Sequence, residues 1–90
     1  MNIQYISQPR VKELLLQLKW GDRFEEEMRE ALEAIHESEL DFEQIRRELT
    51  ESGLVLQLRG EGGNPYLALT DMGQAIADLL HEIEFILTPR

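Results

Sequence analysis

The stretch that decides the fold is Leu49 to Leu69, which reads LTESGLVLQLRGEGGNPYLAL. Gly53 follows an apolar helical stripe, and a glycine at such a point supplies the left-handed residue that often ends a helix. Two short apolar runs come next, Leu54 to Arg59 and Tyr66 to Leu69, separated by the residues GEGGNP. Apolar runs on either side of a glycine-rich connection predict a hairpin. The stretch therefore predicts a helix end, a two-stranded hairpin and a return to helix.

The first strand of this hairpin has a two-residue period. Three leucines alternate with other side chains between Leu54 and Arg59, and such alternation predicts a strand with one face looking inward. The tip holds three glycines, which tolerate unusual dihedral angles, and Pro65, which lacks a ladder donor. We therefore expect the tip to be exposed.

A first helix is predicted near the N-terminus. It follows Pro9, a residue favoured at helix starts, and ends at Gly21. Its core stripe is Val11, Leu14, Leu15 and Leu18. Residues 1 to 7 contain apolar side chains without a decisive period, so a short strand and an extension both fit them.

Two further helices are predicted before the hairpin. One runs from about Arg23 to His36, because Asp22 and Glu25 match a capping box; residues 36 to 40 then form a turn. The next begins after Asp41, which can form a capping box with Gln44. The core face of this third helix is Phe42, Ile45 and Leu49. Ion pairs one turn apart are expected between Glu25 and Arg29 and between Glu43 and Arg47.

The last helix is predicted from a cap at Thr70 to about Thr88, residues 71 to 88. Its apolar stripe is wide, and the final part lies beyond where a small domain would cover it. This part contains the candidate dimer contacts Ile83, Phe85, Ile86 and Leu87. We therefore expect this helix to pack against a second copy of the chain or another protein.

Composition indicates one domain over residues 1–90 with a formal net charge of −9. The charge disfavours polyanionic partners such as DNA. There is no cysteine, no signal-peptide pattern and no apolar run that could cross a membrane. A cytoplasmic protein without membrane partners is the simplest interpretation. Acidic residues crowd the segment from Asp22 to Glu37, which fits a solvated helix face or a docking surface for a basic partner.

The sequence contains no pattern that indicates an enzyme, a cofactor or a metal centre. His36 and His81 are the only histidines, and nearby carboxylates complete only a partial ligand set. GEGG lies in a hairpin tip and not between a strand and a helix start, so it does not match a phosphate loop. Trp20, at the end of the first helix, is expected to be a partly buried core aromatic.

The order of these elements resembles a winged helix-turn-helix domain of the kind found in prokaryotic regulators of the MarR, ArsR and PadR type. RRELTESGLV, from Arg46 to Val55, is similar to the end of the family's recognition helix and its first wing strand. YLALTDMG, from Tyr66 to Gly73, is similar to the second wing strand and the following helix start. The resemblance covers roughly residues 29 to 80 and implies an α+β fold with three helices, a two-stranded wing and a C-terminal helix.

The resemblance also implies where DNA would be contacted. In the family, the third helix enters the major groove and the wing touches the minor groove or the backbone. The matching outward residues here are Gln44, Arg46, Arg47, Arg59 and Asn64. Acidic residues share these elements, so the sequence favours a regulatory module that acts mainly through protein contacts of its acidic and apolar surfaces. The alternative is a dimeric DNA-binding transcriptional regulator that uses the third helix and the wing.

Overall fold

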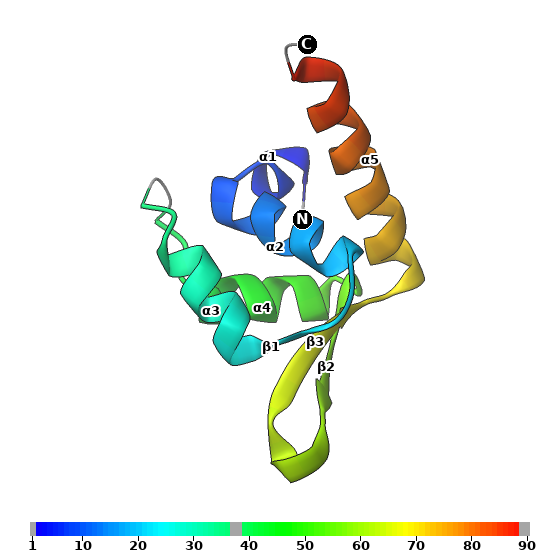
Figure 1. The fold of residues 1–90 in the computed structure, drawn as a ribbon. Coiled ribbons are helices and arrows are strands. Elements are labelled where there is room, and N and C mark those ends of the chain that lie inside the picture. Colours follow the sequence, from blue (N-terminus) through cyan, green and yellow to red (C-terminus); the bar gives the residue numbers. More distant parts are fainter. Residues whose placement is uncertain (1, 37–38, 89–90) are drawn as a thin grey trace.

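The computed structural model describes residues 2–36 and 39–88. Figure 1 shows the helices gathered in one body, with a hairpin projecting from one end and the last helix extending the other way. The helices are α1 (Ile3–Ile6), α2 (Pro9–Lys19), α3 (Glu25–Glu33), α4 (Phe42–Glu51) and α5 (Asp71–Leu87). The strands are β1 (Arg23–Phe24), β2 (Val55–Arg59) and β3 (Pro65–Leu69), and a 3-10 turn, η1 (Glu61–Gly63), forms the hairpin tip.

One apolar core joins α2, α3 and α4 to the base of the hairpin and to α5. Its buried members are Val11, Leu14, Leu15, Leu18, Met28, Leu32, Phe42, Ile45, Leu49, Leu54, Val55, Leu67 and Ala77. The predicted stripe of the first helix and the predicted core face of the third are both confirmed. In each helix the apolar residues recur every three or four positions and therefore share one side.

The predicted helix ends are confirmed around the hairpin. The Gln44 amide donates to Asp41 Oδ1 over 2.8 Å, and the Asp41 amide donates to Gln44 Oε1 over 3.0 Å, which completes the capping box of α4. Gly53 ends that helix with a φ of 78°. Thr70 Oγ1 accepts from the Gly73 amide over 3.0 Å and caps α5.

The prediction of where the second helix starts is wrong. Arg23 and Phe24 form a strand that pairs antiparallel with Leu67 and Tyr66, so the sheet has three strands in the order β1-β3-β2 and not two. The rings of Phe24 and Tyr66 meet edge to face with centroids 6.3 Å apart, a contact that favours this cross-strand pairing. Phe24 takes the position before the first turn of α3, and the expected capping box at Asp22 does not form.

Helix α3 also ends earlier than predicted, at Glu33. The guanidinium of Arg10 donates to the carbonyls of Ile35 and Leu40 over 2.8 and 2.9 Å. These hydrogen bonds satisfy carbonyls outside a helix and hold the following segment in an irregular path. Of the turn predicted for residues 36 to 40, residues 37 and 38 lie outside the described part of the chain.

Residues 3 to 6 are helical, so neither the strand nor the extension considered for the N-terminus forms. The side chain of Asn2 accepts from the Tyr5 amide over 3.0 Å and caps this short helix. Tyr5 and Ile6 pack against the core. Burial, and then the nearby charge of Glu48, raise the pKa of the Tyr5 hydroxyl.

The inward-looking face predicted for the first strand of the hairpin is also wrong. Within β2 only Val55 is buried, whereas Leu56 and Leu58 are 50% and 39% exposed. The hairpin projects beyond the helices, so little of the body covers the leucine face (Figure 1). Alternation along a strand fixes which side chains share a face, but it does not supply a surface to bury that face.

Candidate nucleic-acid interface

The exposed side of α4 is the first part of the candidate interface. Gln44, Arg47 and Glu51 are exposed and recur at intervals of three and four residues, so they share one face. Among residues 2–36 and 39–88, no carboxylate lies within ion-pair distance of Arg47. The guanidinium of Arg47 is therefore available in the middle of this face.

Arg46 has a different environment. Its Nη1 lies 3.2 Å from Glu25 Oε1 and its Nη2 lies 2.8 Å from Glu43 Oε2, and its side chain is only 26% exposed. Glu43 also accepts from Arg29 Nη2 over 2.8 Å, and this hydrogen bond raises the pKa of the Arg29 guanidinium. The expected pairs Glu25–Arg29 and Glu43–Arg47 are thus replaced by pairs between α3 and α4, because Glu25 turns inward.

Sequence reasoning missed Glu25 as part of the site. This residue is 4% exposed, and it lies at the first position of α3, where the helix dipole favours a carboxylate. Its Oε2 accepts a hydrogen bond from Gln57 Nε2 on β2. We call the group formed by Glu25, Arg29, Glu43, Arg46 and Gln57 the Glu25 cluster. The helical period is the signal that could have found Glu25, because this residue precedes the buried Met28 and Leu32 by three and seven residues and so shares their face, whereas the glutamates that follow it are exposed.

The wing supplies the second part of the candidate interface. Arg59 Nη1 donates to the Gly63 carbonyl over 3.0 Å, so the arginine folds along the hairpin tip. Asn64 is exposed, and its carbonyl accepts from the Gly60 amide over 2.9 Å. Gly62 and Gly63 have φ values of 76° and 78°, which only glycine adopts readily. The tip is exposed, as predicted from the sequence.

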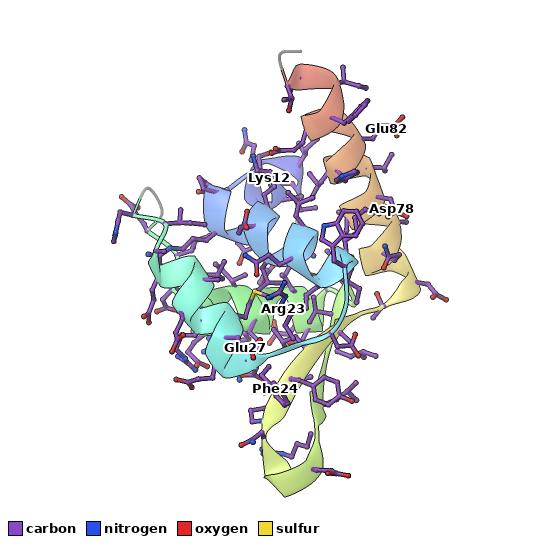
Figure 2. All side chains as sticks on the ribbon, viewed as in Figure 1. Lys12, Arg23, Phe24, Glu27, Asp78 and Glu82 are labelled. Carbon is purple, nitrogen blue, oxygen red and sulfur yellow. The ribbon has the colours of Figure 1, made fainter. Side chains whose placement is uncertain are left out.

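An acidic surface borders the wing. A cleft of about 460 Å³ lies between the start of α3 and the hairpin, and its lining includes Phe24, Glu26, Glu27, Asn64 and Pro65. Figure 2 shows Phe24 and Glu27 beside the base of the wing. The remaining carboxylates of α3 face solvent, which agrees with the expectation of a solvated helix face. The alternative, a docking surface for a basic partner, stays a prediction.

Helix α5 carries apolar residues on two sides. Its buried side contains Gly73 and Ala77. An exposed row follows at intervals of three or four residues; this outer stripe is Met72, Ala75, Leu79, Ile83 and Ile86. Beside it, a groove of about 320 Å³ runs between α1 and α5 and is lined by Ile3, Leu79 and Ile83 among others. Leu87 and Phe85 are also exposed, although Phe85 lies on another side of the helix.

Trp20 is not a core residue, contrary to the expectation from the sequence. Its side chain is 69% exposed and meets His81 of α5 edge to face, with ring centroids 5.3 Å apart. Lys19 lies 4.9 Å above the tryptophan ring and 2.6 Å from Asp78, and its hydrogen bond lowers the pKa of that carboxyl. Within the described ranges, no group of three or more histidine, aspartate or glutamate side chains could hold a metal ion.

Several solved structures share this fold. The transcriptional repressor BigR from Xylella fastidiosa has a TM-score of 0.75 and 23% sequence identity, over 98% of this chain and 84% of that one. The adhesin competence repressor AdcR from Streptococcus pyogenes has a TM-score of 0.70 and 15% identity, over 92% of this chain and 63% of that one. A possible transcriptional regulator for arsenical resistance has a TM-score of 0.62 and 24% identity, over 92% and 82%.

These likenesses confirm the predicted α+β winged-helix fold and the resemblance to regulators of the MarR and ArsR type. No protein-family profile and no curated protein sequence matches the chain. Of the helices formed by residues 2–36 and 39–88, none has the length and apolar character needed to cross a membrane.

Proposed function

We propose that this chain is a DNA-binding transcriptional regulator that contacts DNA through α4 and the wing. The support comes from the shared fold, because the similar structures are a transcriptional repressor, a competence repressor and a possible transcriptional regulator. They favour the second interpretation of the sequence over the first, in which protein contacts of the acidic and apolar surfaces carried the function. A winged helix places one helix in the major groove and its hairpin against the backbone or minor groove.

The observation that carries this proposal is the separation of charges on α4. Arg47 occupies the middle of the exposed face, and Glu43, which would oppose a phosphate there, lies between Arg29 and Arg46. Neutralising this carboxylate lowers its repulsion of a phosphate. Gln44 and Arg47 are residue types that hydrogen-bond to base edges or phosphates. The face can therefore meet DNA even though the whole chain is acidic.

The remaining acidic side chains set the conditions under which DNA binding can be measured. Glu48 and Glu51 are on α4 and Glu61 is at the wing tip, so the net charge of −9 is not confined to a remote surface. Each phosphate contact releases counterions, so affinity falls as salt rises, and a chain with few such contacts needs low ionic strength for detectable binding. Titration of the full chain against random duplex DNA at low ionic strength tests the proposal. Absence of binding at tens of micromolar protein would refute it.

Replacing Arg47 by alanine is expected to weaken DNA binding about tenfold at low salt, because a charge-assisted contact is lost. The slope of log affinity against log salt should also become shallower, by about 0.9 for each Arg47 that neutralises a phosphate. Fluorescence anisotropy of labelled duplex DNA at four or more salt concentrations measures both quantities.

A Lys12→Ala variant is the matched control because it removes the same charge. Lys12 pairs with Glu84 over 2.7 Å and lies toward the opposite end of the molecule from the wing (Figure 2). Its affinity for DNA should stay within about twofold of the original chain, since surface charges distant from the contact are screened. Equal losses in the two variants would show that only overall charge matters and that α4 is not the contact.

The outer stripe of α5 supports a further part of the proposal, a homodimer. Intervals of three and four residues between its apolar side chains match the spacing at which two helices pack along a seam. Burying this row in a symmetric pair would cover the exposed apolar surface and present two copies of α4 to the duplex. The second copy doubles the number of phosphate contacts, which an acidic chain with few arginines needs.

A further inference from the structure

We propose that Glu25 is a positioning residue that connects α4, the proposed recognition helix, to the wing; we call this connection the joint. Arg46 is part of the joint and does not contact DNA. The inference rests on the proposed function, because it assigns roles within that DNA-binding surface. It separates two adjacent arginines of α4 that the sequence treats alike. Arg47 would neutralise phosphate, whereas Arg46 would hold the protein in shape.

The carboxylate of Glu25 is the point where three elements meet. Glu25 belongs to α3, Arg46 to α4 and Gln57 to β2, and each carboxylate oxygen accepts from a different one of the two partners. Glu25 is 4% exposed, and a buried carboxylate is stable only when its oxygens are paired. Burial thus makes both hydrogen bonds obligatory, so α4 and the wing strand are held to the same group.

Within the wing, β2 has few other attachments near this point, whereas β3 is held separately by its pairing with β1 and by the buried Leu67. Gln57 lies in the middle of β2, opposite Leu67 of β3, and the strand is exposed from Leu56 onward. Outside the buried base at Leu54 and Val55, side chains of β2 gain little from packing against the body. The hydrogen bond from Gln57 to Glu25 therefore ties β2 to the group that holds α4, in addition to the attachment of β3 through β1 and Leu67.

The guanidinium of Arg46 is occupied on two sides. Nη1 faces Glu25 and Nη2 faces Glu43, and Glu43 is itself tied to Arg29. A phosphate would have to displace a carboxylate from one of these sites, and displacement from Glu25 would leave a buried charge unpaired. Arg47, one residue further along, has no such competitor among the described residues.

The test compares Gln57→Ala, Arg46→Met and Arg47→Ala in the full chain by two readouts, wing amide exchange and the salt dependence of DNA binding. In Gln57→Ala and Arg46→Met, amides of the β2–β3 hairpin should exchange about fivefold faster, since an interaction that restrains the wing is lost. Their DNA affinity should fall several-fold while the salt slope stays unchanged. Arg47→Ala should show the reverse pattern, with a shallower slope and unchanged wing exchange.

Leu56→Ala is the matched control for Gln57→Ala, because it truncates an exposed side chain at the neighbouring position on the opposite face of β2. Its wing exchange should stay close to that of the original chain. Faster wing exchange in both Gln57→Ala and Leu56→Ala, or in neither, would overturn the proposal that Glu25 connects α4 to the wing. A shallower salt slope in Arg46→Met, matching that of Arg47→Ala, would overturn the assignment of Arg46.

The two levels of the proposal fail separately. If the original chain binds no DNA, the proposed function is wrong, and amide exchange alone then decides whether Glu25 fixes the wing. If Arg46→Met does not fold, Arg46→Gln, which keeps a hydrogen-bond donor near Glu25, takes its place in the salt-slope test, and Gln57→Ala tests the joint from its exposed end. A Glu25→Gln variant adds a third measurement: it keeps the shape but replaces one of the two accepting oxygens by a donating NH2 group, so one of the two hydrogen bonds is lost and wing exchange should rise as in Gln57→Ala.

Discussion

Replacing Gly73 by alanine is expected to lower the free energy of unfolding by about 3 kcal/mol, the upper part of the range for overpacked sites. A Cβ at this position would lie 2.0 Å from the Leu54 carbonyl oxygen and 3.0 Å from its carbon. That oxygen belongs to the backbone and already accepts from the Thr70 amide over 3.0 Å. It cannot move without disturbing the junction between the hairpin and α5.

The clash matters because this junction connects the wing to the rest of the fold. A small domain has a total stability of roughly 5–15 kcal/mol, so the loss would unfold a sizeable fraction of the molecules under mild denaturation. Urea unfolding followed by circular dichroism at a fixed protein concentration measures the shift. Although alanine has the higher helix propensity, by about 1 kcal/mol, the steric term should exceed that gain.

Gly60→Ala is the control for this prediction. Its φ is −88°, which any residue adopts, and an added Cβ would meet atoms at 3.7 Å or more. The change in unfolding free energy should stay within about 0.5 kcal/mol. If both variants unfold at the same urea concentration, backbone contact at Gly73 does not limit the stability of the fold.

The features that could be predicted from the sequence are those that depend on neighbours along the chain. The capping box of Asp41, the left-handed Gly53 and the cap at Thr70 each involve residues within one turn, so local patterns sufficed. The order of these elements then pointed to the winged-helix fold. The constraint on Gly73 could not be predicted in this way, because it comes from Leu54, which lies at the start of the preceding hairpin.

The errors arose where tertiary contacts overrode local signals. Asp22 and Glu25 fit a capping box, but the free edge of β3 offered hydrogen bonds to Arg23 and Phe24, and strand pairing displaced the cap. Trp20 resembles a core residue by type, yet it follows the end of α2 and its exposed ring lies against His81 on the surface. Apolar character alone does not show which side chains find a covering surface.

The candidate site was predictable as a surface but not in its chemistry. Outward positions of α4 follow from helical period, and Arg47 occupies such a position. The role of Arg46 depends on Glu25 and Glu43, of which Glu25 precedes it by 21 residues and lies in another helix. The spacing of Glu25 to Met28 and Leu32 places it on the inner face of α3, but no local rule names its partner, so the ion pair between helices could not be foreseen.

Replacing Leu79 by glutamate is expected to weaken self-association about 100-fold. If the outer stripe of α5 forms a symmetric interface, each substitution removes two buried leucines, roughly 1.5 kcal/mol apiece, and places charge at an apolar seam. Sedimentation equilibrium over a range of micromolar concentrations measures the dissociation constant. Leu79 is 56% exposed, so the folded monomer should tolerate the change, and circular dichroism checks this.

Phe85→Glu separates the outer stripe from the other exposed side of α5. Phe85 is 58% exposed and lies about 160° around the helix from Ile83, on the side that also carries His81. The Phe85→Glu substitution adds the same negative charge as Leu79→Glu, so general charge repulsion between two chains affects both variants equally. Loss of the dimer in Leu79→Glu alone would place the interface on the outer stripe, and loss in Phe85→Glu alone would place it beside Trp20 and His81. A monomeric original chain at high micromolar concentration would instead reject the homodimer, and DNA contact would then have to come from a single copy of α4 and the wing.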